Sequence, residues 1–375
     1  MQLLWEDSLV LKGEDEIRRF FEGSKRRLFV LAKGFDPRMC WGLRTMHEIT
    51  DMDVALMVYS ETPKSSSHDY ASDSEVNMQE FYGLCQNVSV KEIRFPMWRE
   101  EEGRKTSLVK KHIEENFKRD YLQEYEEIII DMSAMPRSIY TVLIKTVYKR
   151  RGNAKLFIIV CENSTLDDSI FPTNTFEEVT YLNGIGTYSI GSEQDANKNV
   201  VWFPMLGTGT EESIKKIADF LQPNEICPIV PFPSLDPARS DRILQKYKEV
   251  LFQRLEIEMK NIIYVSEFNP LLVYKKICMT VSYYAEALSI LNRNDNPKET
   301  KFIFSMQSSK LMEIGLLFAI LDLMKNKYKV GIAVIENEGY EMDKKRYEQK
   351  NNRLCCVCLD QDVFEWTELI HEKKC

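Results

Sequence analysis

The residues best suited to chemistry lie in four loops, each of which follows an apolar run and precedes a helix-like stretch. The first loop runs from Lys33 to Arg38. Lys33 and Arg38 are cations of the kind that bind a phosphate or carboxylate. An alternative stays open, in which Asp36 caps a helix that Pro37 begins and Arg38 is solvated in its first turn.

The second loop runs from Asp131 to Ser138 and follows the apolar run EIIID. A carboxylate at the end of a central, fully apolar strand is poorly explained by structure alone. Asp131 is therefore a candidate general base, metal ligand or acceptor for a ligand hydroxyl. Ser133 and Arg137 are the ligand contacts that we expect beside it.

The third loop contains Gly207 and Thr208 in the run Gly-Thr-Gly-Thr. Glycines before a helix let the backbone approach an anion closely. The run lacks the Gly-Lys-Ser/Thr ending of a Walker loop and the third glycine of a dinucleotide fingerprint. A plain turn with Thr210 as the helix cap is an equal alternative.

The fourth loop, Ser305-Met-Gln-Ser-Ser-Lys310, is the most specific. Ser308 or Ser309 is expected to cap the following helix, and Lys310 falls in its first turn. The helix dipole disfavours a cation there, so a bound anion explains Lys310 better than helix stability does. Gly315 would let this helix pack closely.

A strand followed by Ser-Lys-Leu-Met and a small residue resembles the ligand loop of CARF domains, and two such halves in one chain are similar to the fused pairs called SAVED domains. The resemblance implies a Rossmann-like sensor of cyclic oligonucleotides in prokaryotic defence. Ser309 and Lys310 would then contact ligand phosphate or ribose, and the effector would be another protein.

The elements that position these loops repeat in the order strand, loop, helix, which predicts parallel strands with right-handed crossovers. We expect an α/β protein of two successive Rossmann-like halves, each a mostly parallel sheet flanked by helices. The expected division is 1–162, a linker 163–199, and 200–375 with a short Cys-containing tail. The apolar runs predict strands at 28–32, 53–60, 88–96, 127–131, 155–161, 200–204, 225–231, 261–266, 301–304 and 329–335, with long helices at 106–121 and 237–260. Ligands bind outside the carboxyl ends of such strands.

Length and composition indicate the number of domains and limit the classes of partner that we expect. With 375 residues, two domains are expected. The net charge of −8 argues against an extended nucleic-acid surface or attachment to an anionic membrane. No apolar stretch spans a bilayer, the first residues are acidic, and the scattered cysteines suit reduced thiols, so we expect a cytoplasmic protein.

No cofactor or metal is expected. Cys355, Cys356 and Cys358 with His371 and Cys375 lack a second Cys-x-x-Cys, which favours a terminal strand and helix over a zinc site.

Two functions follow. The first is binding of a nucleotide or other phosphorylated small molecule, as a sensor or accessory component in a bacterial antiphage or stress pathway, with a protein partner or effector. The alternative is an enzyme that cleaves a nucleotide at its glycosidic or phosphodiester bond, with Asp131 as acid or base and Arg38, Arg137 and Lys310 stabilising negative charge. A third interpretation is a scaffold that has lost ligand binding.

Overall fold

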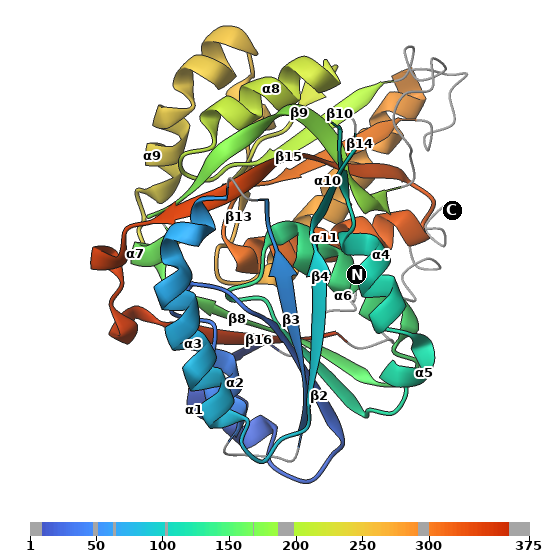
Figure 1. The fold of residues 1–375 in the computed structure, drawn as a ribbon. Helices are drawn as coiled ribbons and strands as arrows, with labels where there is room; N and C mark the ends of the chain where they lie inside the picture. The colour runs from blue at the N-terminus through green and yellow to red at the C-terminus, as the bar shows by residue number, and fades with distance from the viewer. Residues whose placement is uncertain are drawn as a thin grey trace. The chain divides into compact units, whose positions relative to one another are not determined.

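The computed structural model describes residues 10–47, 52–62, 65–101, 104–167, 169–186, 199–291 and 300–359 (Figure 1). The chain divides into two compact units. The first comprises residues 1–174 and 338–375, and the second comprises residues 175–337.

The first sheet has the order β1-β16-β8-β7-β2-β3-β4 in the described ranges. Its central strands β2 and β7 pair in parallel and are buried along their whole length, as expected when helices cover both faces. β16 is antiparallel to both β8 and β1. The strands are β1 (Val10–Lys12), β2 (Arg27–Ala32), β3 (Met52–Ser60), β4 (Val90–Pro96), β7 (Glu127–Asp131), β8 (Lys155–Glu162) and β16 (Arg353–Leu359).

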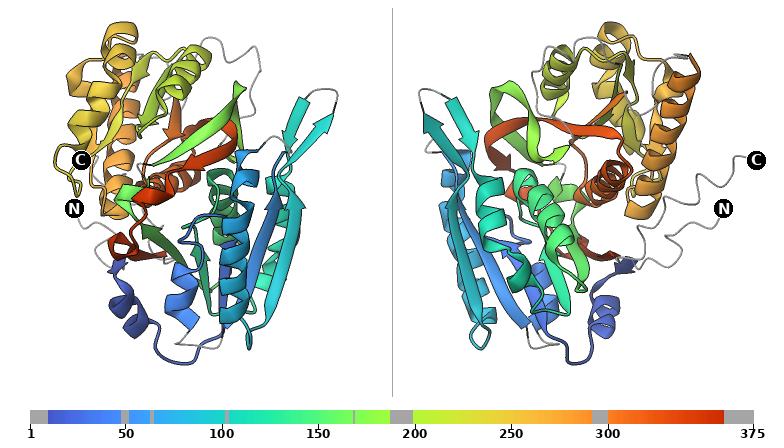
Figure 2. Two further views of the ribbon diagram at one scale, coloured as in Figure 1. Left: turned by 60° about the vertical axis from the view of Figure 1, so that its left-hand side comes forward. Right: turned by 90° about the vertical axis from the view of Figure 1, so that its right-hand side faces the viewer.

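Helices cover both faces of this sheet. Figure 1 shows α1, α2 and α3 on one side and α4, α5 and α6 on the other. Buried Leu43 and Phe81 of the first group, and Phe21 just after α1, pack with Phe29 and Phe157 of the strands. A short hairpin of β5 (Trp98–Glu101) and β6 (Arg104–Ser107) extends beyond the sheet (Figure 2). The helices are α1 (Glu14–Phe20), α2 (Trp41–His47), α3 (Ala71–Leu84), α4 (Val109–Asn116), α5 (Arg119–Leu122), α6 (Arg137–Arg150) and α7 (Ser164–Asp167).

The second sheet has the order β13-β12-β10-β14-β15-β9, with β11 beside the start of β10. α8 and α9 pack on one face around buried Trp202, Ile303 and Tyr247. α10 and α11 pack against each other, and a Cβ at Gly315 would lie 2.1 Å from the Pro270 carbonyl oxygen, so this glycine is required there. The elements are β9 (Ile170–Gly186), β10 (Val200–Met205), β11 (Glu225–Ile226), β12 (Ile229–Pro231), β13 (Ile263–Val265), β14 (Lys301–Met306), β15 (Lys329–Met342), α8 (Glu211–Leu221), α9 (Arg239–Lys246), α10 (Pro270–Leu291) and α11 (Lys310–Lys325).

The two units share one topology. In chain order, the first five principal strands are β2, β3, β4, β7 and β8 in the first unit, and β10, β12, β13, β14 and β15 in the second. Both sets are arranged spatially as 3-2-1-4-5, the doubly wound order of Rossmann folds. The predicted α/β fold with two Rossmann-like halves is confirmed, and α6 and α11 are equivalent helices.

The boundaries differ from those expected. The segment expected to be a linker contains β9, and β16 belongs to the first sheet because it pairs with β8 from Arg353 opposite Glu162 to Leu359 opposite Leu156. The first unit is therefore discontinuous in sequence. The predicted terminal strand at Cys355 to Cys358 is confirmed, while His371 and Cys375 lie outside the described residues.

The two long helices predicted from sequence are replaced by shorter pieces. Thr106 lies in β6, and α4 ends at Asn116 before α5 begins. Between α9 and β13 the chain forms a π-helical turn at Glu249–Arg254 and a 3-10 turn at Met259–Asn261. The spacing of polar residues between α9 and β13 is typical of a helix. In the structure, buried Val250 and Leu251 direct the chain back onto the sheet.

The eight cysteines in the described ranges form no disulfide there and are buried. Within those same ranges, no helix has the length and apolar character needed to cross a lipid bilayer.

Candidate functional site

The first pair of predicted loops meets at the topological switch point of the first sheet. From β2 the chain proceeds outward to β3 and β4, and it then returns to β7 on the other side of β2. The loops after β2 and β7 therefore diverge from neighbouring strand ends, where open α/β sheets bind ligands. They are in close contact, since a Cβ at Gly34 would lie 3.2 Å from the Ala134 carbonyl oxygen.

The second pair meets at the equivalent point of the second sheet, between β10 and β14. A Cβ at Gly207 would lie 1.6 Å from the Gln307 carbonyl oxygen, so only glycine fits this approach. The four loops chosen from the sequence thus occupy the two switch points of the protein, one pair in each unit.

Arg38 is a structural residue and not the ligand contact that the sequence suggested. Its side chain is 2% exposed and makes a two-pronged ion pair with Asp36, at 2.9 Å and 2.7 Å. Its remaining nitrogen donates to Asp167 at 2.7 Å and to the Cys161 carbonyl at 3.2 Å. Burial lowers the pKa of Arg38, but the negative charges of Asp167 and Asp36 raise it by a larger amount. The pKa is therefore above its ordinary value, and the guanidinium stays charged. Arg38 ties the loop after β2 to the end of β8.

Asp131 is also placed differently from the sequence prediction of an acid or base. The residue is 2% exposed, and its Oδ1 accepts the backbone N–H of Ser133 at 2.8 Å. Its Oδ2 lies against α2, because a Cβ at Gly42 would be 2.3 Å from this atom. Asp131 therefore holds the turn after β7 in place. Its burial does not suit proton transfer to a ligand.

Ser133 has a similar supporting role. It is fully buried, and its hydroxyl accepts the backbone N–H of Cys161 at 2.8 Å. Asn77 of α3, which no sequence pattern singled out, donates to the carbonyl oxygens of Gly34 and Asp36, both at 2.9 Å. Together these contacts hold the two loops of the first switch point in one conformation.

Lys33 and Arg137 are the other two cations that the sequence predicted at the first switch point. The Lys33 backbone N–H donates to Met57 at 2.8 Å, which fixes the start of its loop. Its half-buried ammonium makes no hydrogen bond or ion pair with the residues that the structure describes. Half-buried Arg137 is the first residue of α6, whose first turn contains no acidic side chain.

The loop of Gly207 and Thr208 is occupied by internal contacts. The Tyr247 hydroxyl bonds to the Gly207 carbonyl at 3.0 Å and to the Thr210 hydroxyl at 2.6 Å. α8 then begins with Glu211 and Glu212, whose charges already stabilise the helix N-terminus. This loop shapes the switch point, and Thr208 within it is half-buried.

At the start of α11, one side chain does not make the hydrogen bond that the sequence predicts. Ser309 is at the predicted cap position, but its side chain makes no capping hydrogen bond. The Ser309 Oγ is shielded from solvent and has no hydrogen-bond partner among the described residues. Ser308 instead donates its backbone N–H to the fully buried Glu313 at 3.2 Å. Half-buried Lys310 is the first residue of the helix.

Comparison with known proteins gives no family. No family model matches the chain, and no curated protein matches it. A putative universal stress protein from Pseudomonas aeruginosa UCBPP-PA14 is similar at 11% identity, with 85% of this chain and 95% of that chain covered and a TM-score of 0.23. The cytoplasmic domain of a prokaryotic cation chloride cotransporter is similar at 12% identity, with 84% and 98% covered and a TM-score of 0.21. At such TM-scores these likenesses carry no argument about this chain.

Proposed function

We propose that the protein binds a nucleotide or another phosphorylated small molecule at the switch points of its two sheets. One observation carries this proposal. The equivalent helices α6 and α11 both begin with a basic residue, Arg137 in one and Lys310 in the other. The helix dipole makes a cation unfavourable at this position, so its occurrence in both units is better explained by a bound anion.

The surroundings of α11 support the same ligand class. The first N–H groups of a helix have no acceptor within the helix, and phosphate oxygens commonly supply one. The Ser309 hydroxyl, which would otherwise cap the helix, adds another donor at the same place. In the first unit, the ammonium of Lys33 supplies the additional positive charge.

The position of Asp131 favours ligand binding without a chemical reaction, because its carboxylate is buried and accepts a hydrogen bond from the turn that follows β7. We therefore propose a sensor or an accessory component of a cytoplasmic antiphage or stress pathway. The resemblance of the Ser309-Lys310 loop to CARF ligand loops implies this role. In this proposal a protein partner responds to the bound state.

Nucleotide binding is expected to stabilise the chain against heat. ATP, AMP and a cyclic oligoadenylate are the probes, and adenosine is the control without phosphate. A ligand at a hundred times its Kd adds ~2.7 kcal/mol to the free energy of unfolding. For units of this size, that change raises Tm by roughly 5–10 °C in differential scanning fluorimetry. Mass spectrometry should recover the nucleotide unchanged.

Variants then locate the site. Lys310→Ala and Arg137→Ala each remove one charged donor, worth ~1.5–3 kcal/mol, and should weaken nucleotide binding by about tenfold or more in the affected unit. Lys246→Ala on α9 and Lys111→Ala on α4 remove exposed lysines away from the switch points and should leave affinity unchanged. The proposal fails if phosphorylated probes stabilise the protein no more than adenosine does, or if both test variants bind like the controls.

A further inference from the structure

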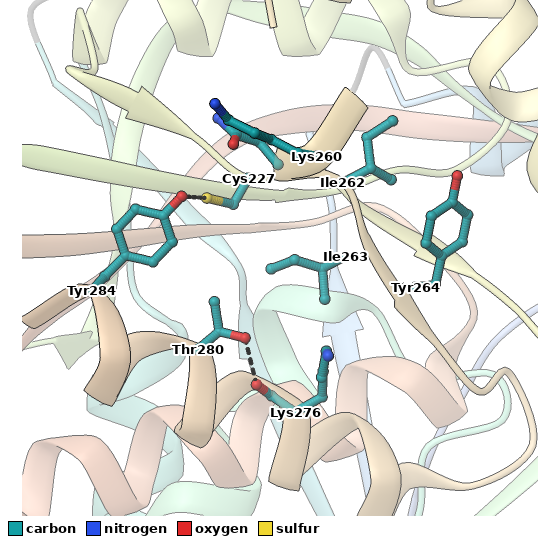
Figure 3. Close-up of a pocket in the computed structure, with 9 residues that line it drawn as sticks. Cys227, Lys260, Ile262, Ile263, Tyr264, Lys276, Thr280 and Tyr284 are labelled. Carbon is teal, nitrogen blue, oxygen red and sulfur yellow. Dashed lines mark hydrogen bonds between the residues drawn. The ribbon is translucent and has the colours of Figure 1, made fainter. Parts of the chain in front are cut away.

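A cavity of about 270 Å³ lies in the second unit, at the end of the sheet opposite to the switch point (Figure 3). One wall is a stripe of α10 formed by Lys276, Thr280 and Tyr284, which are spaced four residues apart and therefore share one helix face. The facing wall is the start of β13, with Ile263 and Tyr264. This cavity is separate from the loops discussed above, because β13 enters the sheet here and leaves it at the other end.

The walls combine rings and apolar surface. Figure 3 shows Tyr284 and Tyr264 on either side of Ile263. Tyr264 is 44% exposed although it lies within a strand, and it contacts the ring of Phe232 with centroids 6.1 Å apart. The Tyr284 ring beside the aliphatic Ile263 favours a flat, apolar ligand group. At about 270 Å³ the cavity is at the small end of ligand pockets, which is enough for a single ring system.

The charges at the cavity favour one negative group. Lys260 already pairs with Glu258 at 2.5 Å, so its charge is balanced. The ammonium of Lys276 makes no ion pair with any residue in the described part of the chain. The α10 wall therefore presents one cation suited to an anionic group, and a carboxylate matches the single charge.

The polar groups of the same wall are arranged to assist. The Cys227 thiol donates to the Tyr284 oxygen at 3.1 Å, which holds the Tyr284 ring in place at the cavity wall. Burial raises the pKa of the Cys227 thiol to about 11, so the thiol keeps its proton at neutral pH. The Thr280 hydroxyl donates to the Lys276 carbonyl at 2.7 Å, which fixes its rotamer and leaves its methyl group as apolar lining.

We propose that this cavity binds a small aromatic carboxylate, with its ring over Ile263 beside the Tyr284 ring and its carboxylate on Lys276. The ligand is held and not transformed. The site is independent of phosphate binding at the switch points, and the inference goes beyond the function proposed above.

Benzoate is the probe, measured by saturation-transfer NMR and by calorimetric titration at millimolar concentrations on the full chain. Benzyl alcohol, which has the ring without the charge, and acetate, which has the charge without the ring, should both bind at least tenfold more weakly. Lys276→Met keeps the aliphatic stem and removes the charge, and it should weaken benzoate binding at least tenfold. Tyr284→Phe keeps the ring that packs beside the ligand and should bind benzoate within twofold of the unaltered chain.

Lys275→Met is the matched control, because Lys275 precedes Lys276 on α10 but is outside the cavity lining. Its affinity for benzoate should stay within twofold of the unaltered chain, and ATP-dependent stabilisation should be the same in both lysine variants. No binding of benzoate by the unaltered chain would overturn the inference. So would equal binding by the Lys276 and Lys275 variants, or acetate binding as tight as benzoate.

Discussion

Replacing Arg38 by methionine is expected to lower the free energy of unfolding of the first unit by ~3–5 kcal/mol. The guanidinium is almost completely buried and holds Asp36 and Asp167, so its removal leaves two carboxylates without their counter-charge. It also frees the loop after β2 from the Cys161 carbonyl. Urea denaturation followed by circular dichroism measures the loss, and hydrogen exchange of β2 peptides assigns it to the first unit.

Arg26→Met is the matched control. Arg26 pairs with Glu124 at 2.9 Å, but their side chains are 57% and 51% exposed, so this pair is worth ~1 kcal/mol or less. A loss at Arg38 no larger than that at Arg26 would contradict the structural role. Weaker nucleotide binding at unchanged stability would restore the ligand contact that the sequence suggested.

Replacing Gly207 by alanine is expected to destabilise the second unit by about 3 kcal/mol. The new methyl group would overlap the Gln307 carbonyl oxygen, and that atom belongs to backbone that cannot rotate away. The loops after β10 and β14 would have to separate, which breaks the switch point itself. Both the urea midpoint and the hydrogen-exchange protection of β10 should fall.

Gly83→Ala tests whether the loss comes from the close approach and not from the exchange of glycine for alanine. Gly83 lies in α3, and a Cβ there meets nothing within 4 Å. This variant should stabilise the protein by ~0.5–1 kcal/mol, because alanine favours helix and restricts the unfolded chain. A loss below about 1 kcal/mol for Gly207→Ala would show that the two loops are not held together as described.

The strands of the two sheets were largely predictable. The run EIIID gives β7 at its observed bounds, and the run from Lys155 gives β8 to within one residue. Such strands are buried on both faces, so continuous apolar sequence identifies them without tertiary information. β9 was missed because its sequence mixes Asn, Thr and Glu with apolar residues, and β16 was identified as a strand but not as part of the first sheet. Pairing partners nearly two hundred residues apart leave no local pattern.

The location of the candidate loops at the switch points was predictable, but the contacts of each side chain were not. Strand-end loops rich in glycine, hydroxyl and basic residues marked both switch points. Lys33 and Arg38 looked alike in sequence, yet Arg38 meets Asp167, a residue that only the fold brings near. Asp131 likewise seemed reactive, but it is buried, its Oδ1 accepts the Ser133 backbone N–H and its Oδ2 lies close to Gly42. Tyr247 and Asn77 had no sequence pattern at all, because their hydrogen bonds to loop carbonyls depend on helix packing.

The discontinuity of the first unit has a consequence for biosynthesis. β8 ends at Glu162, but its neighbour β16 begins at Arg353, after the whole second unit. At ~5–20 residues per second, a ribosome would leave the β8 edge uncovered for roughly ten to forty seconds. An open apolar edge can pair with other nascent chains during this interval. We therefore expect the second unit, which is contiguous, to complete its fold on the ribosome first, while the first unit closes only after β16 has been released from the exit tunnel.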